Sequence, residues 1–403
     1  MLKARYVDRY VQLYEPFRNI KYNLSKTSWE IIKLIKKYGK DKAVPKIMKL
    51  FNIGEKNAKE DIETILYNLE LLKIKIEDIP TKISREKYAP RTVHFDITTK
   101  CNLKCIYCYA TDRLSPRKEL TTKQILRLLN ELAELDTWTI VISGGEPFLR
   151  RDIFKILGHI NELEIMVSIL TNGTLITDNV AKKLASFDNL QMIQVSLDSY
   201  NPEHHELHRG VKGVYEKTLN GIKNLKKYGI TPDIEIVVTP INVKDIERTV
   251  EFLHQLKIKK ITIGPVFTGS GRGRDNKNKL TLDENTLIKT GKKLQELKER
   301  YKETMCIAPN REFFVYTTER RIHKQDIICG VGKSILYISP DGLVYPCLFS
   351  INPETFLGDI KKQSLREIWK NSSLLKKYRR SNLPDIEKCK KCDFRYIYDL
   401  IIH

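Results

Sequence analysis

Short apolar segments alternate with amphipathic segments from residue 91 to about residue 305, and this alternation constrains the fold more than any other feature of the sequence. The apolar segments predict six strands, at residues 93–98, 137–143, 165–170, 192–197, 234–238 and 261–267. The amphipathic segments predict helices at residues 122–135, 152–163, 214–228 and 243–256. Repeated β/α units predict a parallel sheet, so we expect an α/β fold in which residues 92–305 form a partial (β/α)6 TIM-like barrel. The functional residues of such a barrel lie at the carboxyl ends of its strands.

Two further regions flank this core. Residues 1–80 predict a strand at 17–24, helices at 25–38, 42–51 and 55–72, and a short strand at 72–76, which together suggest a winged-helix-like module. Residues 81–91 are predicted to be a linker. Residues 306–403 have shorter, mixed elements and five of the eight cysteines, so we expect a small α+β subdomain there.

Composition excludes several classes of protein. The 403 residues include 71 basic and 50 acidic side chains, a net charge of +21. Basic residues occur in every segment, so we interpret the charge as a Lys-rich solvated surface and expect no nucleic-acid partner. No run of 18 apolar residues and no secretory signal is found, so we expect no membrane association and a cytoplasmic location. Cysteines in that reducing compartment are more often metal ligands or reactive thiols than disulfides.

The most specific motif directly follows the first strand of the core, where three cysteines stand as Cys101-x3-Cys105-x2-Cys108. Three thiolates on one loop can hold three irons of a [4Fe–4S] cluster, which normally has four protein ligands. The fourth iron then keeps an open position for a substrate or cofactor. The alternatives are a zinc site without its fourth ligand and three unrelated cysteines.

The segment from Cys101 to Cys108 resembles the cysteine motif of the radical S-adenosylmethionine (SAM) superfamily. Residues 143–147 (Ser-Gly-Gly-Glu-Pro), 171–173 and 195–198 are similar to further motifs of that family, and the resemblance covers residues 92–275. It implies that Cys101, Cys105 and Cys108 hold a [4Fe–4S] cluster whose open iron binds SAM. Reductive cleavage of SAM would give a 5′-deoxyadenosyl radical that abstracts a substrate hydrogen.

The same resemblance implies a set of SAM-binding residues. Gly144 and Gly145 would let the backbone approach the ligand, and the region of Glu146 would accept hydrogen bonds from the methionyl ammonium. Ser196 and Arg209 would hold the SAM carboxylate, and Tyr107 would lie near the adenine. The full expected set is Tyr107, Gly144, Gly145, Glu146, Pro147, Asn172, Ser196 and Arg209.

The C-terminal cysteines form a second set, Cys329, Cys347, Cys389 and Cys392, with a hairpin turn predicted at residues 339–342. Their spacing resembles the twitch and SPASM auxiliary-cluster domains, which implies one auxiliary [4Fe–4S] cluster. A four-cysteine zinc site is the alternative. Tyr398 stands where a full SPASM domain would carry its next cysteine.

Cys306 is left over, and we expect it to be a buried thiol. The glycine-rich segment 269–273 opens no predicted helix and lacks a P-loop lysine, so we expect it to shape the open edge of the barrel.

Residues 10–76 resemble the PqqD-like peptide-recognition domain of pyrroloquinoline quinone biosynthesis, which implies a leader peptide bound by strand addition. We therefore expect a radical SAM enzyme that matures a ribosomal peptide and takes its electron from ferredoxin or flavodoxin. Two alternatives stay open. One is a radical SAM enzyme acting on a small molecule, such as a tetrapyrrole side chain or an aminosugar. The other is a non-catalytic winged-helix regulator that senses redox state through its clusters.

Overall fold

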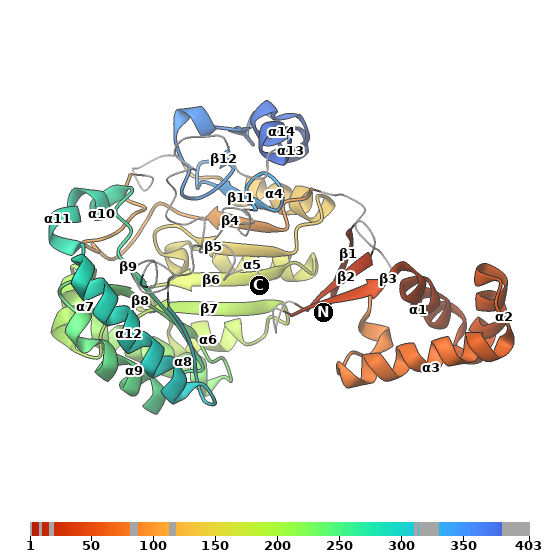
Figure 1. Ribbon diagram of the computed structural model, residues 1–403. Coiled ribbons are helices and arrows are strands. Elements are labelled where there is room, and N and C mark those ends of the chain that lie inside the picture. The colour runs from red at the N-terminus through yellow and green to blue at the C-terminus, as the bar shows by residue number, and fades with distance from the viewer. Residues whose placement is uncertain are drawn as a thin grey trace. The chain divides into compact units, whose positions relative to one another are not determined.

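The computed structural model describes residues 2–7, 10–15, 20–80, 88–112, 118–309, 313 and 330–380. The chain forms two compact units, one comprising Met1–Ala89 and the other beginning at Pro90 (Figure 1). Each unit has its own apolar interior. No helix among the described residues is both long and apolar enough to cross a bilayer.

The first unit packs three helices on a small antiparallel sheet. Its strands are β1 (Lys3–Val7), β2 (Tyr10–Glu15) and β3 (Ile20–Ser25), in the order β1-β2-β3, and its helices are α1 (Lys26–Tyr38), α2 (Lys40–Phe51) and α3 (Glu55–Leu71). Ser25 begins α1 by accepting a hydrogen bond from the backbone N–H of Ser28. Leu13, Trp29 and Leu69 are buried in one cluster that joins the sheet to α1 and α3.

The predicted helices of this unit are confirmed, whereas its strands differ from prediction. Residues 72–76 were expected to form a strand, and that prediction is wrong. The chain turns after α3, because Lys73 adopts a positive φ of 57° and the N–H of Ile74 bonds back to the carbonyl of Leu69. A short 3-10 helix, Ile76–Asp78, follows. The strands β1 and β2 are additional to the prediction.

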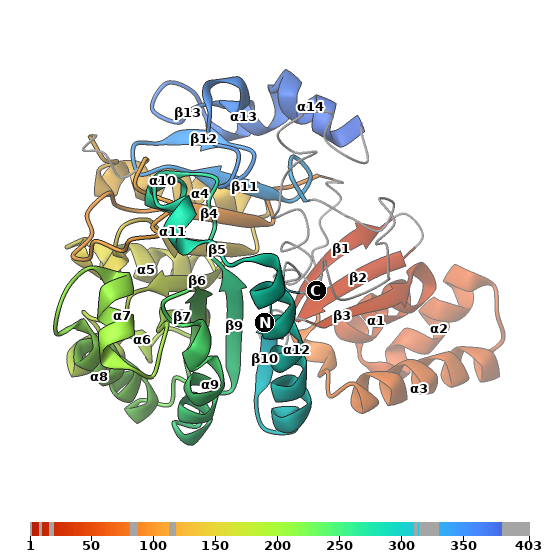
Figure 2. The same ribbon diagram turned by 60° about the vertical axis from the view of Figure 1, so that its left-hand side comes forward.

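The second unit contains the six parallel strands that the sequence predicts. They are β4 (Thr92–Asp96), β5 (Thr139–Ser143), β6 (Met166–Thr171), β7 (Leu190–Ser196), β8 (Asp233–Val238) and β9 (Lys260–Pro265). The helices between them are α4 (Thr122–Glu134), α5 (Ile153–Glu162), α6 (Asp178–Leu184), α7 (Pro202–Arg209), α8 (Val214–Lys227) and α9 (Ile246–Gln255). The strands lie side by side in sequence order, which makes the curved, partly closed barrel of Figure 2.

The sheet continues beyond the six strands at both edges. The strand β10 (Cys306–Pro309) pairs in parallel with β9, and β11 (Ile335–Ile338) pairs in parallel with β4. The strands β12 (Leu343–Tyr345) and β13 (Gly358–Asp359) extend the β11 edge. The predicted turn at 339–342 is confirmed as the β11–β12 hairpin. The described C-terminal strands thus share one sheet with the barrel.

The remaining helices complete the second unit: α10 (Gly271–Asp275), α11 (Lys277–Leu280), α12 (Glu284–Tyr301), α13 (Leu365–Asn371) and α14 (Ser373–Arg380). The helix α10 corrects one expectation, because the glycine-rich segment does open a short helix. Cys306 corrects another. Its side chain is exposed rather than buried, because it is the first residue of an edge strand.

The division into two units predicts separate responses to core mutations. Leu13→Ala removes a fully buried side chain from the first unit and should destabilise that unit by about 2–5 kcal/mol. Amide hydrogen exchange should then accelerate in α1–α3 and stay unchanged in β4–β9. The matched control, Ile236→Ala, empties a fully buried position of β8 and should give the reverse pattern. Equal acceleration in both units by either variant would contradict the division.

Candidate functional site

The three cysteines of the first motif lie on one loop, residues 97–112, at the carboxyl end of β4. Cys101 is exposed, and Cys105 and Cys108 are half-buried. Surrounding protein atoms nevertheless desolvate part of the Cys101 thiol and raise its pKa to about 11, and the neighbouring charges of Cys105, Glu146 and Cys108 add to that rise. The three thiols are therefore close enough to influence one another electrostatically.

The chemistry of these donors suits an iron–sulfur cluster. The thiolates of a cubane cluster each bind a different iron. The donor set of Cys101, Cys105 and Cys108 thus fits a [4Fe–4S] cluster with one iron left open.

The start of the cysteine loop is fixed by partly buried polar contacts. One carboxylate oxygen of Glu119 accepts hydrogen bonds from the Thr98 hydroxyl (2.9 Å), the Thr99 N–H (2.8 Å) and the Thr99 hydroxyl (2.9 Å). Arg150 donates to the carbonyl of Ile97 at 2.9 Å. These contacts hold the chain where it leaves β4.

Gly144 and Gly145, at the end of β5, lie against the backbone of the same loop. The N–H of Gly145 donates to the Thr98 carbonyl at 2.9 Å, and the N–H of Glu146 donates to the Lys100 carbonyl at 2.7 Å. A Cβ atom on Gly145 would lie 2.0 Å from the Lys100 oxygen, and one on Gly144 would lie 2.5 Å from the Thr98 oxygen. Glycine is therefore required at both positions for contact with the cysteine loop, a neighbour that the sequence did not indicate.

Glu146 has its carboxylate fully buried within the chain. Its Oε1 accepts from the Thr171 hydroxyl at 2.8 Å and from the Phe148 N–H at 3.2 Å, and its Oε2 accepts from the Asn172 N–H at 2.9 Å. Burial raises the pKa of Glu146 to about 7. This side chain joins the end of β5 to the end of β6, and Pro147 begins the short 3-10 helix that follows it.

Asn172 connects the end of β6 to the cysteine motif itself. Its amide donates to the side-chain oxygen of Asn102 at 2.9 Å, and the amide of Asn102 donates to the Thr174 hydroxyl at 2.9 Å. Asn102 directly follows Cys101. The expected SAM-binding residue Asn172 therefore has a positioning contact that the motif alone did not reveal.

A buried carboxylate, Asp198, contacts a side chain of the cysteine loop and two side chains of α7. It accepts a hydrogen bond from the Tyr107 hydroxyl at 2.8 Å and lies 2.9 Å from Nη2 of Arg209 and 3.3 Å from Nδ1 of His208. Burial alone would raise the pKa of Asp198, but the Arg209 guanidinium and the adjacent His208 ring hold it well below its ordinary range. Asp198 is thus ionised and pairs with Arg209.

Tyr107 and Arg209 are packed together beside Cys105. The Arg209 guanidinium lies 5.4 Å from the centre of the Tyr107 ring, and its Nη1 lies 3.9 Å from the sulfur of Cys105. The Nε of Arg209 is buried and has no hydrogen-bond partner within the described chain. A buried donor of this kind fits a ligand acceptor such as a carboxylate. The contacts of Tyr107 and Arg209 with SAM remain predictions.

A polar row crosses β7, β8 and β9 on one face of the sheet. Ser196 is in register with Glu235, and Glu235 with Thr262. The three side chains are half-buried, whereas Ile234 and Ile236 on the other face of β8 are fully buried. Burial raises the pKa of Glu235. Sequence reasoning missed Glu235, although a lone glutamate between isoleucines in a predicted strand was the available signal.

Of the second cysteine set, only Cys347 belongs to the described residues. It is buried just after β12, and its sulfur accepts a hydrogen bond from the Phe349 N–H at 3.4 Å. Cys329, Cys389 and Cys392 lie outside the described residues.

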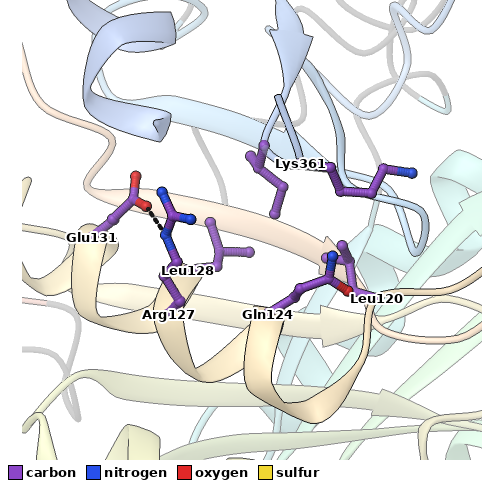
Figure 3. A pocket seen from close by; sticks show the side chains of 7 residues that line it. Leu120, Gln124, Arg127, Leu128, Glu131 and Lys361 are labelled. Carbon is purple, nitrogen blue, oxygen red and sulfur yellow. Dashed lines mark hydrogen bonds and ion pairs between the residues drawn. The ribbon is translucent and has the colours of Figure 1, made fainter. Parts of the chain in front are cut away.

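A small pocket between α4 and the residues after β13 contains none of the expected site residues (Figure 3). It is lined by Leu120, Gln124, Arg127, Leu128, Glu131, Ile360 and Lys361.

The raised pKa of Glu146 predicts a specific pH dependence of stability. Between its ordinary pKa of 4.5 and about 7, the folded protein holds a proton there that the unfolded chain releases. The free energy of unfolding should therefore fall as pH rises through this window. Glu146→Gln should flatten that part of the profile, measured by denaturant unfolding of the apo-protein.

A matched control for this prediction is Glu119→Gln. Hydrogen bonds from Thr98 and Thr99 outweigh burial and lower the pKa of Glu119. Its contribution to stability is lost as pH falls, so the control should change the profile on the acid side of the window. A Glu146→Gln variant that keeps the wild-type slope between pH 4.5 and 7 would refute the prediction.

Comparison with known proteins agrees with this geometry. The Radical SAM superfamily model matches residues 95–253, and the SPASM model, described as an iron–sulfur cluster-binding domain, matches residues 329–393. The antilisterial bacteriocin subtilosin biosynthesis protein AlbA of Bacillus subtilis strain 168 is 30% identical over 320 residues, which cover 78% of this chain and 68% of AlbA. The AdoMet-dependent heme synthase of Methanosarcina barkeri is 27% identical over 325 residues, which cover 77% of this chain and 90% of that protein.

A solved structure shares the fold. The crystal structure of Streptococcus suis SuiB bound to precursor peptide SuiA superposes with a TM-score of 0.69 at 17% identity, over 98% of this chain and 93% of that one. The barrel, the cysteine loop and the two matching family models lead to one assignment. This chain belongs to the radical SAM superfamily, as an enzyme that uses a [4Fe–4S] cluster and SAM and that carries a SPASM iron–sulfur domain.

Proposed function

We propose that Cys101, Cys105 and Cys108 hold the SAM-binding cluster and that the enzyme modifies a peptide substrate. The observation that carries the site assignment is the position of three mutually close thiols on one anchored loop at the carboxyl ends of parallel strands. Bound there, the cluster and SAM would supply a 5′-deoxyadenosyl radical that abstracts a substrate hydrogen. The chain's own residues position both groups.

The proposed SAM contacts follow from the geometry around Arg209. Its unpartnered Nε is the donor offered to the SAM carboxylate, while Asp198 holds the rest of the guanidinium in place. Ser196 ends β7 on the face that also carries Glu235. We assign Ser196 to the same carboxylate and the Ser196–Glu235–Thr262 row to the side of the site that faces the substrate.

The proposed auxiliary centre is one [4Fe–4S] cluster held by Cys329, Cys347, Cys389 and Cys392. The SPASM match includes all four of these cysteines. Two separated pairs supply the four thiolates that one such cluster takes. We further propose ferredoxin or flavodoxin as the electron donor and the cytoplasm as the location, because a reducing compartment keeps cluster ligands as thiolates.

The first unit supports a peptide as the substrate. In its sheet β1 and β3 each pair only with β2 among the described residues, so each has one edge where an extended peptide could add a strand. Residues 1–80 contain 17 basic and 11 acidic side chains, which favours an acidic leader. The likeness to SuiB, a protein crystallised with its precursor peptide, extends over nearly the whole chain.

Helix α3 offers a surface to read the side chains of such a leader. Tyr67 and Leu71, one helical turn apart, are 62% and 63% exposed, so they form a small apolar patch on the surface of α3. We propose that they contact apolar leader residues next to the added strand.

A second candidate function uses the same radical site on a tetrapyrrole side chain. It is favoured by the similarity to the AdoMet-dependent heme synthase, 90% of which is covered by the alignment. A tetrapyrrole would make no use of the α3 surface, because it has no leader to bind. The two candidates therefore predict different effects of mutations in the first unit.

The peptide proposal predicts a binding defect without a chemical one. The double variant Tyr67→Ser, Leu71→Ser should raise KM for a leader-bearing peptide encoded beside this gene by at least roughly tenfold, because burying one such side chain is worth about 1.5–3 kcal/mol. Formation of 5′-deoxyadenosine without peptide should stay at the wild-type rate, since the radical site is untouched. Both quantities are measured by chromatography of the same reactions.

Leu50→Ser is the matched control, because Leu50 is a 55% exposed apolar residue of α2 in the same unit. It should leave KM unchanged. A double variant that processes the peptide with wild-type KM would show that the α3 surface does not take part in peptide recognition. Conversion of a tetrapyrrole by the wild-type enzyme, with no peptide modified, would establish the second candidate.

A further inference from the structure

The glycine-rich segment after β9 is fastened to the cysteine loop. We call residues 269–276 the strap; they include α10, which lies near the end of β9 in Figure 1. The strap donates hydrogen bonds to successive groups of the loop: Asn276 Nδ2 to the Ile106 carbonyl (2.8 Å), Arg272 N to the Cys108 carbonyl (2.9 Å), Ser270 Oγ to the Tyr109 carbonyl (2.9 Å) and Gly271 N to the Asp112 carboxylate (2.9 Å).

The glycines of the strap are required by this close contact. Gly271 has a φ of +58°, and a Cβ atom there would lie 2.4 Å from the Cys108 carbonyl oxygen. A Cβ atom on Gly273 would lie 2.2 Å from the Phe267 carbonyl oxygen and 3.1 Å from that of Tyr107. Backbone atoms cannot move aside as a side chain can. The glycine-rich composition of the strap therefore reflects its close packing against the cysteine loop.

Arg272 is the cationic member of the strap that reaches a proposed cluster ligand. Its Nη1 donates to the carbonyl of Cys105 at 2.9 Å, and its backbone N–H bonds to the loop as described above. No carboxylate pairs with Arg272 in the part of the chain that the structure describes. Arg274, by contrast, pairs with Asp112 at 3.0 Å, and Arg209 is neutralised by Asp198.

We propose that Arg272 is a positioning residue that holds Cys105 in place and, through its unneutralised charge, favours the reduced state of the cluster. Reduction adds one negative charge to the cluster, and a nearby cation stabilises that charge. This inference rests on the proposed assignment of Cys105 as a ligand. It adds to that assignment a residue outside the cysteine motif, supplied by a segment more than 150 positions away in the sequence.

Two substitutions separate charge from shape. Arg272→Gln removes the charge and keeps an amide donor. Arg272→Lys keeps the positive charge but replaces the planar guanidinium with an ammonium group. The midpoint potential of the SAM-responsive cluster, measured by electron paramagnetic resonance during a redox titration, should become more negative in the Gln variant and stay near wild type in the Lys variant. The control Arg300→Gln removes an exposed arginine of α12 that pairs with Glu247 and should leave the potential unchanged.

A second measurement on the apo-protein tests positioning directly. Alkylation of Cys105, followed by mass spectrometry, should be faster in Arg272→Gln than in wild type. The loop loses the hydrogen bond from the Arg272 guanidinium to the Cys105 carbonyl. Wild-type potential together with wild-type alkylation in the Gln variant would overturn the inference. An equal shift of potential in Arg300→Gln would also overturn it, because the effect would then be one of net charge.

Two further outcomes are decisive. If Arg272→Gln takes up no cluster, unchanged alkylation of Cys105 in its apo-protein overturns the positioning role, and faster alkylation supports it. A separate variant tests the assignment of Cys105 as a cluster ligand. Cys105→Ala should lose the iron of the SAM-binding cluster, and full iron retention by that variant would show that Cys105 is not a ligand, whatever the result at Arg272.

Discussion

The structure of the site depends on backbone hydrogen bonds between the end of β5 and the loop that follows β4. The bonds from Gly145 to Thr98 and from Glu146 to Lys100 continue the pairing of the two strands past their regular ends. They fix the loop backbone immediately before Cys101. Neither Gly144 nor Gly145 can carry a side chain, because a Cβ atom would lie on a carbonyl oxygen of the loop.

Charge around the loop is distributed unevenly, and the distribution suits an anionic cluster. Asp198 neutralises Arg209, so this pair adds little net charge while it holds the Tyr107 ring. Arg272, by contrast, contributes a cation without a carboxylate partner in the described chain. A cluster bound by the three thiolates would offset their mutual repulsion.

The sequence predicted the elements whose signals are local and missed those that depend on distant partners. The six strands and the cysteine motif were visible because periodicity and spacing are short-range properties. The strand β10 was not assigned, and the parallel pairing of β11 with β4 was not predicted, since both depend on partners distant in the sequence. The role of Arg272 was hidden for the same reason, because no local pattern links it to Cys105.

The most direct test of the central claim is electron paramagnetic resonance of the reduced, reconstituted protein during titration with SAM. SAM should change the signal of the wild-type protein, because it should bind the open iron of the cluster on the 97–112 loop. The variant Cys101→Ala, Cys105→Ala, Cys108→Ala should keep about four irons in the auxiliary site, with a signal that SAM leaves unchanged. A SAM-dependent change in that triple variant would contradict the account.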